Sequence, residues 1–388
     1  MKDFASRARE ALAAKGMSAR AASRALRYDP AYLSRVLNGK QDPSPQLADA
    51  LDDLLDLRGT LSALAPGNAV MPAAPEPPEG VEGEIFGMRA SARLFLDHDN
   101  RFGGDHVAHA AVQVWRAAQR RLDSGTVPSR SQGEYLKTVA ELAEVSGWLL
   151  YDADQPTLSR SAFMEALMLA RQAGDRPMEW FALDMLAMLA VHQQRPGEAL
   201  RIADEILSRT RIPPRVVLLA RIRKARALAQ TGDRARTLTE LDAARGALNE
   251  SIASRDPSWA WWVNERELAG HQGESYLSLG DPAAAMSGIQ RALDLSRETA
   301  SNGRREISYS AALLEAAVRA QAWRDGESVM VTMPPLLEVV SSGRSRHRLR
   351  ATLGEIVRAH HAPAWLSDLA HDVASVPSLT ASIADSRA

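Results

Sequence analysis

A proline-rich stretch at residues 65–84 constrains the fold more than any other feature of the sequence. It reads APGNAVMPAAPEPPEGVEGE and holds five prolines, three glycines and four glutamates. Such a segment cannot bury enough apolar surface to offset its ordering entropy, and its prolines keep it extended. We therefore expect a tether between a small N-terminal unit, residues 1–64, and a large C-terminal unit, residues 85–376, with a flexible tail at residues 377–388.

Both units are predicted to be all-α. Leucine and alanine dominate the sequence, aromatic residues make up 5%, and the β-branched runs that mark strands are almost absent. The chain has no cysteine, which excludes disulfides, thiolate metal sites and cysteine nucleophiles. No apolar run approaches the roughly 20 residues that a membrane span needs. We expect a cytoplasmic protein that does not contact a membrane.

The N-terminal unit shows the pattern of four or five short helices. Phe4, Ala8 and Leu12 share one face of the first helix, and Gly16 is expected to end it. Further start and stop signals follow in order: Ser18 as a cap, Asp29 with Pro30 as a helix start, Gly39 as a stop, and Ser44 with Pro45 opening a helix with the apolar residues Leu47, Leu51 and Leu54.

Charge is unevenly distributed in this unit. Residues 1–40 hold nine lysines and arginines against three acidic residues, whereas residues 41–57 hold five acidic residues and no basic one. The formal net charge of −1 for the whole chain hides this contrast. A basic stretch followed by an acidic one indicates a polarised small domain.

The order of these short segments is specific enough to name a family. SARAASRAL, RYD, PAYLSRVLNGK and DPSPQLADALDDLL follow one another as first motif helix, turn, recognition helix and trailing helix. Residues 4–57 thus resemble a helix-turn-helix domain of the Xre or phage-repressor type. Ala19 stands where that family often has glutamine, so we expect no DNA contact from position 19.

The resemblance implies sequence-specific binding of double-stranded DNA by the helix that begins at Pro30. Leu33, Val36 and Leu37 would face inward, and Arg35 would read guanine through two hydrogen bonds. The remaining expected DNA contacts are Ala31 at a thymine methyl group, Tyr32, Ser34, Asn38 and Lys40 at phosphates, and a basic row of Arg20, Arg24 and Arg27. One such module buries only about 600 to 1,000 Å² on DNA, so we expect a homodimer.

The C-terminal unit shows degenerate repeats. Three stretches, residues 188–207, 227–248 and 275–296, each place a short turn between alanine-rich helical patterns, roughly 40 to 50 residues apart. Stacked antiparallel helix pairs, an α-solenoid, follow from this pattern. The unit resembles the tetratricopeptide-like sensor halves of actinobacterial Xre-type regulators. The stretches that carry this resemblance, besides the joints, are ARLFLDHDNRFGGDHVAHAAVQVW and DPSWAWWVNERELAGHQGESYLSLGD. That resemblance implies dimerisation and a response to a peptide, small molecule or small companion protein.

Three local clusters have more than one interpretation. His106 and His109, near Asp97, His98, Asp99 and Asp105, could bind a metal, but surface histidines and helix capping by Asp105 are favoured. Trp259 and Trp262, with Glu265 and Arg266, either belong to the core or line a ligand site. The basic residues 341–350 contact DNA or an acidic partner, or, as we favour, form a solvated helix start.

No catalytic constellation and no cofactor motif is present in the sequence, so we expect neither an enzyme nor a bound cofactor. The leading hypothesis is a dimeric DNA-binding transcriptional regulator whose repeats receive a signal. The alternative is a helical-repeat scaffold for protein contacts whose N-terminal domain serves only for docking.

Overall fold

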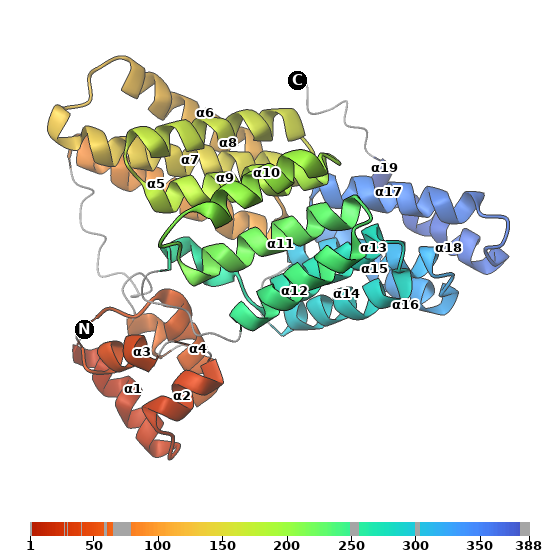
Figure 1. Cartoon of the computed structure of the whole chain (residues 1–388), viewed down its shortest axis with the longest axis horizontal. Helices are drawn as coiled ribbons and strands as arrows, with labels where there is room; N and C mark the ends of the chain where they lie inside the picture. The colour runs from red at the N-terminus through yellow and green to blue at the C-terminus, as the bar shows by residue number, and fades with distance from the viewer. Residues whose placement is uncertain are drawn as a thin grey trace. The chain divides into compact units, whose positions relative to one another are not determined.

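The computed structural model describes residues 2–26, 28, 30–39, 41–57, 60–64, 79–248, 256–298 and 303–380. The elements of these residues are α-helices and short 3-10 helices, which confirms the all-α prediction (Figure 1). The chain packs as two units. One comprises Met1–Pro77, Thr210–Leu219 and Asp242–Asn264, and the other comprises Pro78–Arg209, Ala220–Leu241 and Glu265–Ala388.

The N-terminal helices begin and end where the sequence predicts. They are α1 (Lys2–Ala14), α2 (Ala19–Leu26), α3 (Pro30–Leu37), α4 (Pro45–Leu55) and the 3-10 helix η1 (Ser62–Leu64). The hydroxyl of Ser18 accepts a hydrogen bond from the Ala21 N–H at 3.2 Å, and Ser44 caps α4 in the same way. Gly16 and Gly39 follow α1 and α3 with φ of +60° and +67°, a conformation that glycine adopts without steric cost.

One apolar core joins these helices. It contains the predicted residues of α1 and α3, namely Phe4, Ala8, Leu12, Leu33, Val36 and Leu37. On α4, Leu47, Leu51 and Leu55 are buried, and Leu54 is half-buried and packs against the same core, as the predicted stripe requires. Asp52 is also buried, because it accepts hydrogen bonds from the Leu61 and Ser62 amides and thereby holds η1 against α4.

The C-terminal part of the chain is a series of longer helices. Their bounds are α5 (Val81–Phe102), α6 (Asp105–Asp123), α7 (Gln132–Asp152), α8 (Pro156–Gln172), α9 (Arg176–His192), α10 (Pro196–Ser208), α11 (Pro214–Gln230), α12 (Arg234–Leu248), α13 (Glu265–Ser278), α14 (Pro282–Arg297), α15 (Gly303–Arg319), α16 (Trp323–Val339), α17 (Gly343–Arg358), α18 (Ala364–Ala374) and α19 (Pro377–Thr380), with the 3-10 helices η2 (Ser129–Ser131) and η3 (Ser258–Trp262).

The predicted tether and tail are described only at their edges. Helix α5 begins at Val81, inside the stretch expected to be a linker, and α19 occupies the first residues of the expected tail. Residues 65–78 and 381–388 lie outside the described residues.

One three-residue turn recurs between paired helices. Its middle residue has positive φ, as at Asp154, Gln194, Gly232, Gly280 and Gln321. Its last residue donates a backbone hydrogen bond to the carbonyl five residues earlier, at 2.8 Å from Arg195 to Ala190, 3.1 Å from Asp233 to Leu228, and 2.9 Å from Asp281 to Tyr276. This bond satisfies a carbonyl that the helix end leaves open, and it fixes the angle to the next helix. The two predicted Gly-Asp joints are confirmed as turns of this kind. The third joint is also such a turn, but it lies at residues 193–195, and Pro196 and Gly197 of the predicted Arg-Pro-Gly turn begin α10.

The end of α5 and the start of α6 pack against the segment that leads into α17. The Ser341 N–H donates to the Phe102 carbonyl at 2.7 Å, and a Cβ at Gly103 would lie 2.2 Å from the Ser341 oxygen. The Asp105 carboxylate accepts from the Gly343 N–H at 2.8 Å and pairs with Arg346. The expected capping of a helix by Asp105 is therefore wrong, because α6 has no side-chain cap and Asp105 instead fastens α6 to the start of α17.

Close packing of α7 on α8 depends on the absence of a side chain at Gly147. A Cβ there would lie 2.6 Å from ring carbons of Phe163 on α8. We predict that Gly147→Ala lowers the free energy of unfolding by about 1 to 3 kcal/mol, as overpacked cores do. Gly87→Ala on α5 is the matched control, because a Cβ there meets nothing within 4 Å. The control should raise stability by up to about 1 kcal/mol. Urea unfolding of both variants checks this, and equal effects would contradict it.

Candidate functional site

Helix α3 is positioned as a recognition helix by its buried face. Leu33, Val36 and Leu37 are buried, whereas Ser34 is exposed and Arg35 is half-buried at the surface. The Arg35 Nε donates a hydrogen bond to the Gln41 side-chain oxygen at 2.9 Å. This bond restrains the guanidinium group at its Nε.

Tyr32 ties α3 to α4. Its hydroxyl accepts a hydrogen bond from the Ser44 N–H at 2.9 Å, and its ring stacks on Tyr28 with centroids 6.1 Å apart. Burial raises the pKa of Tyr28 to about 12, so that phenol stays protonated at neutral pH. The structure thus gives Tyr32 a role inside the domain in addition to the phosphate contact expected from sequence.

The other expected DNA contacts are distributed around α2 and α3. Arg20 and Arg24 on α2 are exposed, and the Asn38 amide donates to the Ser34 carbonyl at 2.8 Å. Ser34 and Asn38 also border a hollow of about 260 Å³ whose further lining residues are Arg9, Leu12, Ala13, Met17, Ala19 and Leu37. Arg27, Lys40 and the Ala31 side chain lie outside the described residues.

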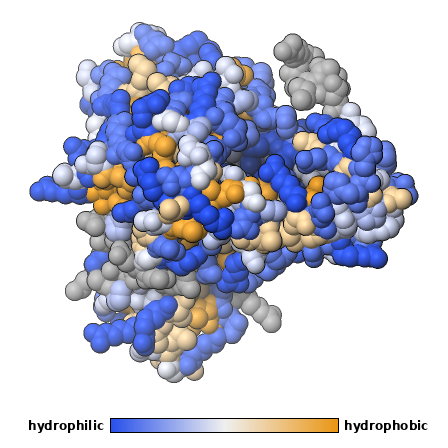
Figure 2. Space-filling view, turned by 45° about the vertical axis from the view of Figure 1, so that its right-hand side comes forward, coloured by the Kyte–Doolittle hydropathy of each residue, from blue (hydrophilic) through white to orange (hydrophobic). Residues whose placement is uncertain are grey.

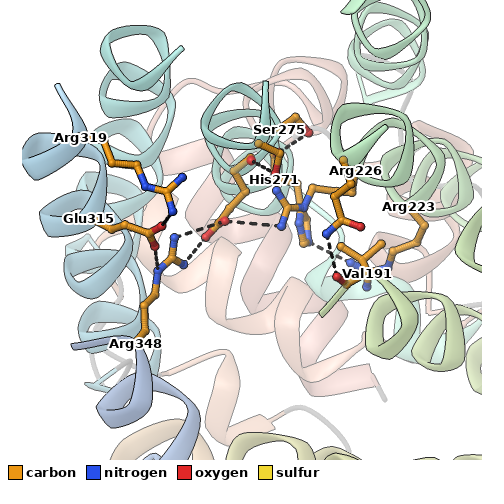
Figure 3. Close-up of polar contacts among 11 residues, drawn as sticks. Val191, Arg223, Arg226, His271, Ser275, Glu315, Arg319 and Arg348 are labelled. Carbon is orange, nitrogen blue, oxygen red and sulfur yellow. Dashed lines mark hydrogen bonds and ion pairs between the residues drawn. The ribbon is translucent and has the colours of Figure 1, made fainter. Parts of the chain in front are cut away.

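A second polar region lies on the odd-numbered helices of the repeats (Figure 3). Arg223 on α11 binds Asp184 on α9 through two hydrogen bonds of 3.0 and 2.9 Å. Its third nitrogen lies 3.0 Å from the His271 ring on α13. Burial, together with Arg223 and Arg226, holds the pKa of His271 well below its ordinary value. A neutral imidazole can accept the hydrogen bond from Arg223.

The same polar region continues to α15 and α17. Arg348 on α17 pairs with Glu274 on α13 and, at 2.6 Å, with Glu315 on α15 (Figure 3). Arg226 reaches the same Glu274 carboxylate at 3.4 Å. Burial alone would raise the pKa of Glu274, but Arg348 and Arg226 lower it to about 2. We call the odd-numbered helices with these polar residues the inner layer.

The arginines of residues 341–350 were assigned the wrong environment from sequence. The helix start is confirmed by Ser342, which caps α17. However, Arg344, Arg346 and Arg348 are half-buried rather than fully solvated, and each forms an ion pair with a carboxylate of another helix, on Asp152, Asp105 and Glu274 respectively. Local sequence gives no sign of partners that lie some 70 to 240 residues away along the chain.

The residues suggested for a ligand site lie in different local settings. Trp259 and Trp262 belong to the half-buried turn of η3. Glu265 forms an ion pair with Arg291 at 3.0 Å, and Arg266 is buried with its Nε 3.9 Å from Glu267. Whether these residues bind a ligand stays a prediction.

Two features are absent from the part of the chain that the structure describes. No helix in it is long and apolar enough to cross a bilayer. Within the same residues, no group of three or more histidine, aspartate or glutamate side chains is arranged to hold a metal ion.

Comparison with known proteins places the N-terminal helices in a family. Residues 3–65 match the family model of a helix-turn-helix domain, and this range holds all of α2 to η1 and all of α1 except Lys2. A search of curated proteins finds no significant match to the chain. The chain therefore carries an N-terminal helix-turn-helix domain followed by a long series of helices.

The hydrogen bond between Tyr32 and Ser44 predicts a measurable contribution to stability. We expect Tyr32→Phe to lower the free energy of unfolding by about 1 kcal/mol, because the Ser44 N–H loses its partner while the ring packing remains. Amide hydrogen exchange should rise at Ser44. Unchanged protection at that amide would contradict the assignment.

The lowered pKa of Glu274 predicts how stability changes with acid. A carboxyl whose pKa is lower in the folded state stabilises the fold above its unfolded pKa, and this stabilisation is lost as pH falls through the folded value. Glu274→Gln should therefore cost about 3 kcal/mol at pH 7, and the difference from wild type should narrow between pH 5 and about 2. Urea unfolding at several pH values measures it. Glu355→Gln, exposed on α17, is the control, and a pH-independent difference for Glu274→Gln would contradict the prediction.

Proposed function

We propose that the protein is a sequence-specific DNA-binding transcriptional regulator of the Xre type, acting as a cytoplasmic homodimer. The observation that carries the proposal is the match of residues 3–65 to a helix-turn-helix family, together with the packing of α2 and α3 on one core. Such a domain places its second helix in the major groove of DNA.

Base reading is assigned to Arg35. Its Nε is engaged by Gln41, and the two terminal nitrogens of the guanidinium group are the pair that matches guanine O6 and N7. A residue held at its Nε loses less side-chain entropy on binding, so this contact preorganises the arginine. Ala31 is assigned to a thymine methyl group.

Phosphate contacts are assigned to the polar and basic residues around Arg35. Ser34 is exposed on α3, Asn38 directly follows this helix, and Arg20 and Arg24 are exposed on α2. Tyr32, Arg27 and Lys40 complete the set expected from sequence. These contacts orient the domain on the duplex and give affinity that falls steeply with salt.

The repeats are proposed to form the homodimer and to receive the signal, which is a peptide, a small molecule or a small companion protein. They resemble tetratricopeptide-like sensor domains, as in actinobacterial regulators, and the recurring three-residue turns support a stacked-pair architecture. A signal acts only through a difference in affinity between the DNA-competent and DNA-incompetent arrangements of the dimer.

The recognition helix is tested by Arg35→Ala. We predict a loss of about 1 to 3 kcal/mol in operator binding, with relaxed preference at one guanine position. Gln41→Ala is the matched variant, because it removes the partner of Arg35 and keeps the arginine, and it should retain the base preference. The measurement is a binding titration against operator fragments identified by genome-wide occupancy mapping. Unchanged affinity and base preference in Arg35→Ala would show that α3 is not the recognition helix. Absence of specific duplex binding by the unsubstituted protein would favour the alternative, a helical-repeat scaffold for protein contacts.

A further inference from the structure

Helix α5 exposes two large apolar side chains. On the face of the molecule that Figure 2 shows, hydrophilic residues surround separate apolar areas. Among the described residues, Leu94 on α5 is the most exposed large apolar side chain, at 67%, and Phe86 on the same helix is exposed at 50%. One apolar side chain at a surface is ordinary, but two on one helix face indicate a surface that a partner covers.

Phe86 and Leu94 border one strip along α5. Successive residues of a helix are rotated by about 100°, so Phe86 lies about 40° to one side of Ala90 and Leu94 about 40° to the other. The side chains that α5 buries lie on the opposite side of the helix, at Ile85, Met88, Ala92, Phe95 and Asp99. We call Gly83, Phe86, Gly87, Ala90 and Leu94 the α5 strip. A Cβ at Gly87 meets nothing within 4 Å, so the centre of the strip is open to a second helix.

The place of α5 in the chain makes this exposure unusual. It is the first helix of the C-terminal series. The end helices of a stacked series need a polar outer face for solubility, because no further helix covers them. α5 departs from that rule at Phe86 and Leu94. Covering the α5 strip with protein removes both side chains from water, which favours association.

The charges of α5 differ between its two ends. Glu82 and Glu84 lie in the first turn and Arg101 in the last, and Glu84 already pairs with Arg121 at 3.3 Å. Glu82 and Arg101 are both exposed. When two copies of α5 pair antiparallel, the first turn of each lies against the last turn of the other, so opposite charges meet at both ends. A parallel pair places like charges together. The charges of α5 therefore match an antiparallel copy of the same helix.

The side chains between the two ends fit the same pairing. With the two-fold axis at Ala90, Phe86 of one copy lies at the level of Leu94 of the other. Gly87 of one copy lies at the level of Arg93 of the other and leaves space for that long side chain. Asp97, four residues after Arg93 on the same helix face, offsets its charge.

We propose that the α5 strip binds a second copy of this chain, with the two α5 helices antiparallel and the two-fold axis at Ala90. The proposal rests on the homodimer proposed above as part of the function, and it gives that homodimer its interface. The same surface is used by both copies, as in every two-fold contact.

This arrangement also suits two recognition helices on one duplex. α5 has 22 residues, so in an antiparallel pair the starts of the two helices lie about 30 Å apart. Half-sites one turn of DNA apart are separated by about 34 Å. Each chain therefore leaves its N-terminal unit and enters the dimer at about the spacing of two half-sites.

The first test is sedimentation velocity of the full chain over a range of concentrations up to about 100 μM. One pair of helices buries less than the roughly 1,200 Å² of a stable interface, so we expect a micromolar dissociation constant. Leu94→Glu should raise that constant about ten-fold or more, because it places a charge against Phe86 of the other copy. Met168→Glu is the matched control, since Met168 on α8 is 63% exposed and lies outside the α5 strip. An unchanged constant in Leu94→Glu, or an equal rise in both variants, overturns the interface.

The second test fixes the two-fold axis. The chain has no cysteine, so one introduced thiol can form a disulfide only with a second copy. Ala90→Cys places the two thiols on the axis, where their Cβ atoms come within the roughly 4 Å that a disulfide needs. We expect Ala90→Cys to give a covalent dimer under mild oxidation and Ala117→Cys, exposed on α6, to stay monomeric on a denaturing gel. No covalent dimer, or equal yields from both variants, overturns the pairing.

The third test uses the charges at the helix ends. Arg101→Glu should weaken the dimer by several-fold, because it faces Glu82 of the other copy. Adding Glu82→Arg to the same chain restores opposite charges and should restore the dimer. A double variant that is weaker than Arg101→Glu alone overturns the antiparallel pairing.

Operator binding is measured separately, so the interface and the proposed function can fail independently. A dimer that Leu94→Glu leaves intact overturns the α5 interface and keeps the homodimer. An unsubstituted chain that stays monomeric at about 100 μM overturns the α5 interface and the homodimer, and a different protein then covers the α5 strip. An α5 dimer that binds no operator keeps the interface and loses the regulator.

Discussion

Burial of charge in the inner layer is the constraint on which the repeat series depends. A charged side chain is tolerated inside a protein only when an opposite charge and well-formed hydrogen bonds meet it there. Arg223 meets Asp184 across α9 and α11, and Arg348 meets Glu274 and Glu315 across three helices. Each pair forms only if the helices stack with the correct register and angle. The ion pairs are therefore weak evidence for extra stability but strong determinants of one specific stacking arrangement.

The recurring turns supply that angle. Six joints between consecutive described helices have the same turn, with a middle residue of positive φ and a backbone hydrogen bond to the carbonyl five residues earlier. Gly232 and Gly280 adopt this conformation without cost, whereas Gln194 and Gln321 adopt it against the usual preference of residues with a Cβ. This difference explains why two of the turns were clear in the sequence as Gly-Asp pairs, while the turn at residues 320–322 was not among the predicted joints.

The helix-turn-helix domain was predicted in detail because its signals are local. Ser18, Ser44, Gly16 and Gly39 act on backbone groups within a few residues, and the apolar spacing of α1 and α3 gives their buried faces directly. Arg344, Arg346 and Arg348 show where this approach fails. Their spacing is that of an exposed basic helix start, and only the packing of distant helices turns them inward. For the same reason, the inner layer was invisible in the sequence.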